Sequence, residues 1–209
     1  RREVASITKL MTALLVLEAL DRDEIALTDS VQISPRAAAM KGSQALLDAS
    51  AVYPLEDLLR TTIMASANDS AVALSEYIAG SEENFVDRMN RRAAELGMTN
   101  TNYVNCTGYP QSGQYTTARD VCRLCCEIAK HPRYNQYASV WIDKLTHPGG
   151  RVTDLTNTNR LVRFYEGCDG YKTGSTDAAK YCLAATAEKN GMRLVAIVLG
   201  TPVSQTRFN

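Results

Sequence analysis

SITKLMTALLVLEAL, residues 6–20, is the stretch that decides how this chain folds. Apolar side chains occur on nearly every side of a helix drawn through it, whereas a helix at a protein surface keeps a polar face. The segment therefore predicts a helix buried in the middle of a domain. It is interrupted by Thr12 and Glu18 and falls short of the roughly 20 apolar residues that span a bilayer. We expect neither a transmembrane helix nor a signal peptide.

Outward from this segment, apolar spacing and cap residues predict that helices dominate the residues up to about 130. The expected helices run from Pro54 to about Ala65, from a polar break at 66–69 to Gly80, from the cap Ser81 to Gly97, and from Thr117 to Lys130. Between the last two, residues 99–116 are rich in Asn, Thr, Gly and Tyr with no clear period. We expect an ordered loop there, and a loop of that length is usually functional.

The last third of the sequence changes from helical to strand-like patterns. Short β-rich runs at 170–175, 181–187 and 194–199 are separated by turn residues, which predicts an antiparallel sheet. We therefore predict one α+β domain over residues 1–209, with a helical part at about 1–135 and a sheet part at about 165–200. Three strands make a thin sheet, and the chain opens on its most buried helix. We therefore expect residues to be missing before Arg1 and after Asn209.

Charge and cysteine content exclude several classes of function. Lys and Arg number 23, as do Asp and Glu, so no net field attracts a nucleic acid or an anionic membrane, and we expect no nucleic acid partner. The six cysteines lack the paired C-x2-C spacing of a structural zinc site, and we expect no metal and no cofactor. Cys122, Cys125 and Cys126 share one predicted helix, where we expect them on one face, packed against the core.

Ser6 and Lys9 lie three residues apart near the start of the buried helix, on one face and about one turn from each other. A lysine flanked by Leu10, Met11 and Leu14 is hard to keep charged, and a neutral amine can take a proton from a serine hydroxyl. The pair is therefore a candidate nucleophile and base. The alternative is an ordinary helix N-terminus with a solvated lysine, since S-x-x-K arises by chance about once in a chain of this length.

Two further motifs carry hydroxyl, amide and amine groups. Ser66 and Asn68 fall at the break between two predicted helices, where both can point into a cleft, although a capping turn uses the same residue types. Lys172, Thr173 and Gly174 lie in a predicted strand, where glycine lets another group approach closely. The alternative for this lysine is an edge-strand residue that protects the sheet.

The order S-x-x-K, S-x-N, K-T-G resembles the motif set of penicillin-binding proteins and class A β-lactamases. The similarity extends through the runs 5–12, 65–70, 96–101, 115–120 and 169–176 and covers nearly the whole chain. With these runs the sequence resembles the D-alanyl-D-alanine carboxypeptidases, which are low-molecular-mass penicillin-binding proteins, and above all their sporulation-type members. It departs at 105–109, Asn-Cys-Thr-Gly-Tyr, where such proteins usually carry Asn-Pro-x-Gly-Leu.

The resemblance implies a transpeptidase-like α+β fold, shared with β-lactamases, in which a helical cluster packs on an antiparallel sheet whose N-terminal strands are missing here. It also implies a serine D-Ala-D-Ala carboxypeptidase that shortens peptidoglycan stem peptides and is acylated by β-lactams. Ser6 would be the nucleophile, Lys9 its general base and Ser66 a proton relay. Backbone N–H groups of Ser6 and Ser175 would form the oxyanion hole. Substrate would be bound by Asn68, Lys172, Thr173, Gly174, Ser175 and Arg207.

The implied location is the cell-wall side of the cytoplasmic membrane, with membrane attachment only through a segment outside this chain. Two other functions stay open. A class A-like β-lactamase needs an added glutamate, and no E-x-x-L-N segment occurs between Asn68 and Lys172. A non-catalytic penicillin-binding sensor would carry the same motifs. His131 and His147 each precede a proline in a predicted turn, so nothing supports a Ser-His-Asp triad.

Overall fold

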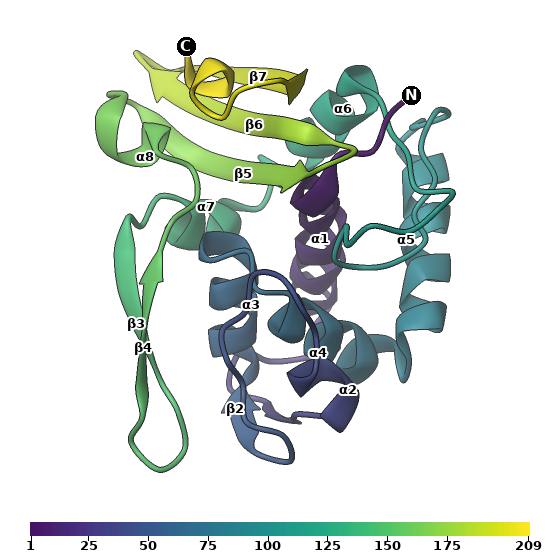
Figure 1. The fold of residues 1–209 in the computed structure, drawn as a ribbon, viewed down its shortest axis with the longest axis vertical. Coiled ribbons are helices and arrows are strands. Elements are labelled where there is room, and N and C mark those ends of the chain that lie inside the picture. The colour runs from purple at the N-terminus through teal and green to yellow at the C-terminus, as the bar shows by residue number, and fades with distance from the viewer.

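The computed structural model describes all 209 residues and has a three-stranded antiparallel sheet at one end with helices packed beneath it (Figure 1). A long loop-bearing hairpin, β3 and β4, extends down the side of the helices. The architecture agrees with the predicted α+β class. The helical and sheet parts pack through one apolar core, which draws residues from both.

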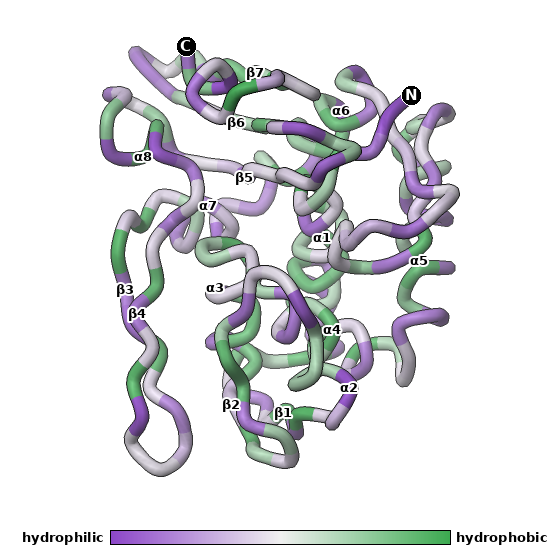
Figure 2. The backbone as a smooth tube through the Cα atoms, in the orientation of Figure 1, coloured by the Kyte–Doolittle hydropathy of each residue, from purple (hydrophilic) through white to green (hydrophobic).

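The central helix begins with a 3₁₀ turn, η1 (Ala5–Thr8), and continues as α1 (Lys9–Asp21). Every residue from Ile7 to Leu14 is buried, which confirms the buried helix predicted from the opening stretch. Figure 2 shows α1 largely in the hydrophobic colours, whereas α5 at the flank alternates between polar and apolar residues. Burial on all sides leaves α1 little freedom to shift, so it is a rigid support for side chains at its first turn.

The other predicted helices are present, with ends set by the expected caps. They are α3 (Leu55–Met64), α4 (Asn68–Ala79), α5 (Glu82–Glu95) and α6 (Ala118–Ile128). The Ser81 hydroxyl accepts from Asn84 N at 3.1 Å and the Thr117 hydroxyl from Asp120 N at 3.2 Å. Gly80 ends α4 in the left-handed conformation.

Three short helices were not predicted: α2 (Pro35–Ala38), α7 (Pro132–Ala138) and α8 (Leu161–Phe164). At α7 the sequence predicts only the end of the preceding helix, because the residue before a proline disfavours helical backbone. Proline also fits the first turn of a new helix, where its missing N–H has no partner to lose. Pro132 does both, since α6 stops before it and α7 begins at it.

The predicted sheet consists of β5 (Cys168–Thr176), β6 (Lys180–Lys189) and β7 (Met192–Thr201), hydrogen-bonded in that order. Two strand pairs were missed: β1 (Ser30–Gln32) with β2 (Val52–Pro54), and β3 (Ile142–Thr146) with β4 (Val152–Thr156). In β3 and β4 only Leu145 and Leu155 are buried. One apolar pair is too little to create the alternation from which strands are predicted. A 3₁₀ turn, η2 (Gln205–Phe208), follows the sheet.

The prediction that three cysteines of α6 pack against the core is right for one of them. Cys125 is buried, Cys122 is partly buried and Cys126 is exposed. The buried face of α6 centres on Val121 and Cys125, and each following residue turns about 100° away from that face. All six cysteines of the chain are free thiols. No helix in the structure has both the length and the apolar character needed to cross a membrane.

Candidate active site

The amine of Lys9 lies 3.0 Å from the hydroxyl oxygen of Ser6. Ser6 is in the 3₁₀ turn and Lys9 is the first residue of α1, so the rigid start of the central helix fixes both. Lys9 is 1% exposed, which is incompatible with the alternative of a solvated lysine. Ala5, just before Ser6, has a φ of +50°, and strained backbone of this kind occurs where the surrounding structure holds a functional group in place.

Lys9 has two more oxygen partners, both from other parts of the chain. Its Nζ lies 2.6 Å from Asn68 Oδ1 and 2.7 Å from the backbone oxygen of Thr107. Burial is the main cause that lowers the pKa of the Lys9 amine from 10.5 to about 7. Near neutral pH the amine is therefore uncharged in a large share of molecules, which is the state that accepts a proton.

The junction between α3 and α4 brings Asn68 and Ser66 to the same region. Asn68 begins α4, and its Nδ2 donates to the Lys41 backbone oxygen at 2.6 Å, which orients its Oδ1 toward Lys9. Ser66 has a φ of +64°, is 3% exposed, and its hydroxyl has no hydrogen-bond partner. Neither side chain caps α4, whose N-cap residue is Ala67. The capping-turn alternative is therefore wrong.

The loop 99–116, predicted to be functional, supplies the Thr107 oxygen to Lys9. The sequence motifs gave no indication of this contact. Gly108, with a φ of +77°, lies so close to the start of η1 that a Cβ there would overlap the Ala5 backbone oxygen and lie 2.9 Å from Thr8 Oγ1. The Asn105 side-chain oxygen accepts from Gly108 N at 2.7 Å and fixes the turn. The glycine at position 108 is the sequence feature from which this close approach to η1 could have been predicted.

Strand β5 places Lys172, Thr173 and Gly174 directly against η1. A Cβ on Gly174 would overlap the Val4 backbone oxygen and lie 3.0 Å from Ser6 N, so glycine is what lets the strand approach the serine. Lys172 is 1% exposed, which rules out a solvated edge-strand lysine. Burial, with the nearby charges of Lys9 and Arg207, holds the pKa of its amine well below the ordinary value.

Arg207 and Ser175 lie at the other end of this strand segment. The Arg207 guanidinium donates to the Gly174 backbone oxygen at 3.3 Å, and stacks 5.4 Å from the ring of Tyr181. It has no carboxylate partner. Arg207 is thus a cation held beside β5 by backbone acceptors, and Ser175 is exposed.

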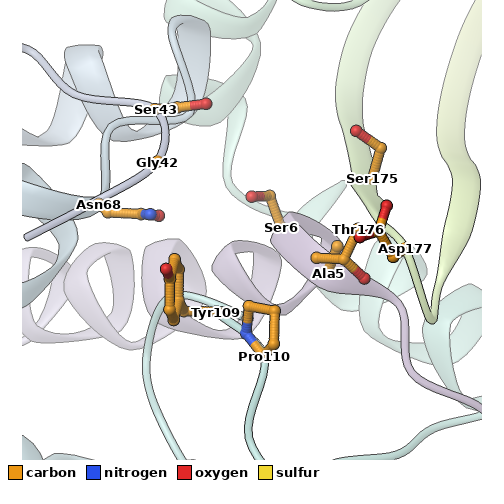
Figure 3. A pocket seen from close by; sticks show the side chains of 11 residues that line it. Ala5, Ser6, Gly42, Ser43, Asn68, Tyr109, Pro110, Ser175, Thr176 and Asp177 are labelled. Atoms are coloured by element: carbon orange, nitrogen blue, oxygen red, sulfur yellow. The ribbon is translucent and has the colours of Figure 1, made fainter.

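An open cleft of about 340 Å³ contains Ser6 (Figure 3). One wall comes from Asn68 with Gly42 and Ser43, and the opposite wall from the end of β5 at 175–177. Tyr109 and Pro110 of the long loop line a third side. The Ser6 side chain points into the space between these walls. Lys172, Thr173 and Arg207 are not among the residues that line this cleft.

The wall at 42–47 is held by a buried carboxylate. Asp69, the second residue of α4, accepts from Ala45 N at 3.0 Å and from Leu47 N at 3.2 Å. The backbone N–H of Asn68 donates to the Ser43 oxygen at 2.7 Å. The first turn of α4 therefore orients Asn68 and also fixes the loop beside it. Sequence analysis did not identify this role of Asp69.

Neither histidine lies in the cleft. His131 Nδ1 is 2.6 Å from Asp21 Oδ2, and His147 Nδ1 is 2.7 Å from the Tyr53 hydroxyl. His147 lies in the turn of the β3–β4 hairpin and is buried against Thr153 of β4 and Tyr53 of β2. The cleft therefore contains a serine–lysine pair and no serine–histidine pair.

Comparison with known proteins gives one consistent family. A family model described as D-alanyl-D-alanine carboxypeptidase matches residues 1–203. The chain is 42% identical over 203 residues to D-alanyl-D-alanine carboxypeptidase DacF of Bacillus subtilis, covering 97% of this chain and 52% of that protein. It is 36% identical over 217 residues to DacC of Escherichia coli, covering 98% and 52%. The chain thus spans about half the length of these curated relatives.

Solved structures give the same result for the fold. The D-alanyl-D-alanine carboxypeptidase DacD of Francisella tularensis superposes with a TM-score of 0.94 at 30% identity, over 99% of this chain and 62% of that one. Penicillin-binding protein D2 of Listeria monocytogenes, solved with ampicillin bound, gives 0.85 at 32% identity, over 99% and 83%. These superpositions confirm the transpeptidase-like α+β fold predicted for the chain.

Proposed function

The chain belongs to the D-alanyl-D-alanine carboxypeptidase family, and from that premise we propose that it removes the terminal D-alanine from peptidoglycan stem peptides through an acyl-enzyme on Ser6. The observation that carries this proposal is the buried Lys9 amine, 3.0 Å from the Ser6 hydroxyl and with a pKa lowered to about 7. A serine without such a base is a weak nucleophile at neutral pH.

The hydrogen bonds of Lys9 support its proposed role as the proton acceptor. A neutral amine has two N–H groups and one lone pair, and Asn68 Oδ1 and the Thr107 backbone oxygen can only accept. Both N–H groups are therefore used, and the lone pair faces Ser6 Oγ. In the proposed reaction Lys9 takes the hydroxyl proton as Oγ bonds to the carbonyl carbon between the two D-alanines.

The leaving D-alanine needs a proton on its nitrogen when the C–N bond breaks. Ser66 is proposed to relay that proton from Lys9, and its buried hydroxyl, which has no partner of its own, is available for the transfer. Water then attacks the Ser6 ester, which releases the shortened peptide and restores the hydroxyl. Backbone N–H groups of Ser6 and Ser175 are the proposed oxyanion hole, each contributing about 3 kcal/mol to transition-state stabilisation.

Recognition of the terminal carboxylate is assigned to Lys172, Thr173 and Arg207. Burial, and in smaller part the nearby charges of Lys9 and Arg207, lower the pKa of the Lys172 amine, and neither Lys172 nor Arg207 has a carboxylate partner. An arriving carboxylate therefore relieves repulsion between cations as well as forming new bonds. Asn68 is proposed to hold the substrate amide, and Gly174 to let β5 approach it.

Peptidoglycan lies outside the cytoplasmic membrane, so the proposed substrate implies extracytoplasmic action on the cell-wall side. β-Lactams, whose strained amide reacts with the same serine, are the proposed covalent inhibitors. Attachment to the membrane through a segment other than these residues stays a prediction. Asp177 is the only carboxylate that lines the cleft, and a rapid β-lactamase of the class A type requires a glutamate to deacylate.

The test combines penicillin labelling with peptide hydrolysis. Benzylpenicillin should add its mass to the intact wild-type protein and to Ser30→Ala, a control serine exposed on β1, but not to Ser6→Ala. The wild type should also release D-alanine from a peptide ending in D-Ala-D-Ala, whereas Ser6→Ala should not. Labelling of Ser6→Ala at the wild-type rate would exclude this serine. Loss of the adduct within seconds would favour a β-lactamase, and a lasting adduct without D-alanine release would favour a sensor.

A further inference from the structure

The cleft that contains Ser6 is lined by a single charged residue, which the proposed mechanism does not use. That residue is Asp177, exposed in the turn directly after β5. Figure 3 shows it at the end of the strand that forms one wall of the cleft. It forms no ion pair, whereas Asp57, Asp143 and Asp169 each pair with an arginine. An uncompensated carboxylate on the wall of an open cleft favours a cationic group on the molecule that binds there.

The direction of β5 relates Asp177 to the rest of a bound peptide. Lys172 and Thr173, to which the terminal carboxylate is assigned, lie earlier in the strand and are buried. The next residue, Gly174, passes against the nucleophile, since a Cβ at this position would lie 3.0 Å from Ser6 N. β5 therefore leads from the carboxylate end of the peptide, past the reacting carbonyl, to Asp177. The part of the peptide that stays on the serine extends toward this aspartate.

The length of this segment matches the spacing of two charges on an extended peptide. A strand rises roughly 3.3 Å per residue, so Thr173 and Asp177 are at most about 13 Å apart along β5. Two residues of an extended peptide cover about 7 Å, and a long side chain covers the remainder. The D-alanine between them carries only a methyl group. β5 pairs only with β6, so its other edge has no neighbouring strand and can receive an extended peptide.

We propose that Asp177 binds a side-chain amine on the residue directly before the two D-alanines. The inference rests on the proposed function and names a substrate class for it: peptides with a cation at this position and a carboxylate at the end. The charges along β5 have the matching order, with Lys172 and Arg207 beside the earlier part of the segment and Asp177 at its end. Asp177 determines specificity and takes no part in bond breaking.

Two synthetic peptides that differ by one acetyl group test this. Both end in D-alanyl-D-alanine, and the residue before the pair is lysine in one and Nε-acetyl-lysine in the other. The ratio of kcat/KM for the lysine peptide to that for the acetyl-lysine peptide is measured from release of D-alanine. Wild type should favour lysine, and in Asp177→Asn the ratio should fall about two- to fivefold, the effect expected of one solvent-exposed ion pair. Asp87→Asn, at an exposed position of α5, should leave the ratio unchanged.

Two further measurements distinguish a binding contact from a structural role of Asp177. In Asp177→Lys, a peptide with glutamate before the D-alanine pair should be cleaved faster than the lysine peptide, because the charge of the subsite is reversed. Benzylpenicillin has no amine, so it should acylate Asp177→Asn no more slowly than wild type. Slower acylation, together with an equal loss of activity on both peptides, would show that Asp177 only supports the structure and would overturn the inference.

The outcomes separate this inference from the proposed function. Failure of the wild type to release D-alanine from either peptide would overturn the proposed function and this inference with it. Release of D-alanine with the same ratio in wild type and Asp177→Asn would overturn the inference alone. Equal cleavage of the lysine and acetyl-lysine peptides by the wild type would do the same, because the carboxylate would then not contact the amine.

Discussion

Gly108→Ala should inactivate the protein without touching any proposed catalytic side chain. The added Cβ would overlap the Ala5 backbone oxygen and approach Thr8 Oγ1 to 2.9 Å. The overlap is with backbone, so it is relieved only if the 105–109 turn and η1 move apart, by about 1 Å. That movement separates the Thr107 oxygen from Lys9 and shifts Ser6, and a misplacement of this size costs about 10²-fold in rate. Destabilisation should be about 2–5 kcal/mol, from overpacking together with the positive φ.

Gly191→Ala is the matched control. Gly191 has a φ of +74° in the β6–β7 turn, close to the +77° of Gly108, but a Cβ there would meet nothing within 4 Å. It carries the conformational cost of about 1–2 kcal/mol without the overlap. The difference between the two variants therefore isolates the contact with η1.

The assay is the rate of benzylpenicillin acylation, followed by intact-protein mass, with urea unfolding of each variant alongside. Gly191→Ala should unfold at lower urea but acylate at the wild-type rate. Gly108→Ala should acylate about 10²-fold more slowly even under conditions where it is fully folded. Wild-type acylation by folded Gly108→Ala would refute the reasoning, because the turn would then tolerate the extra atom.

Burial lowers the pKa of Lys9 to about 7, so the acylation rate should rise about tenfold per pH unit below pH 7, as the amine loses its proton, and should level off above pH 7. An acylation rate that does not change between pH 5 and 9 would contradict this. Lys9→Ala should acylate ~10²–10⁴-fold more slowly at pH 8. Asp69→Asn should lower the free energy of unfolding by about 1–3 kcal/mol, because buried loop N–H groups lose a charged acceptor. The control Asp23→Asn, at an exposed position, should leave the free energy of unfolding unchanged. Equal urea midpoints for the two variants would count against the loop contact. A thiol reagent should modify exposed Cys126 before buried Cys125. Faster labelling of Cys125 would show that the buried face of α6 is assigned to the wrong residues.

Local sequence patterns were sufficient to predict those elements that depend on contacts between residues close together in the chain. Helix ends at Gly80, Ser81 and Thr117 depend on contacts within four residues, and the strands of the main sheet are joined by short turns. The spacing of Ser6 and Lys9 on one helical turn likewise brings their side chains together without help from elsewhere. The apolar residues around Lys9 favoured a lysine that is hard to keep charged, but they left a solvated lysine open as the alternative.

Patterns failed where one signal has two physical meanings or where the signal is weak. Pro132 ends one helix and begins another, and only packing of the following turn decides that α7 forms. The β3–β4 hairpin has one buried apolar pair, Leu145 and Leu155, and its strands are held mainly by each other's backbone. In α6 the i, i+3, i+4 spacing predicted one core-facing side for the three cysteines, but it does not fix the angle at which the core meets the helix, and only Cys125 is buried.

The sequence by itself determined the central helix, the three motifs and the family resemblance, because each is written in residues that are close together along the chain. Only the tertiary structure decided that the Thr107 oxygen and Asn68 both accept from Lys9 and that Gly108 lies against Ala5. The contact between Lys9 and Thr107 alone joins residues 98 positions apart in the chain. These contacts depend on how helices and strands pack, and packing is set by the sum of many weak contacts that no single stretch of sequence contains.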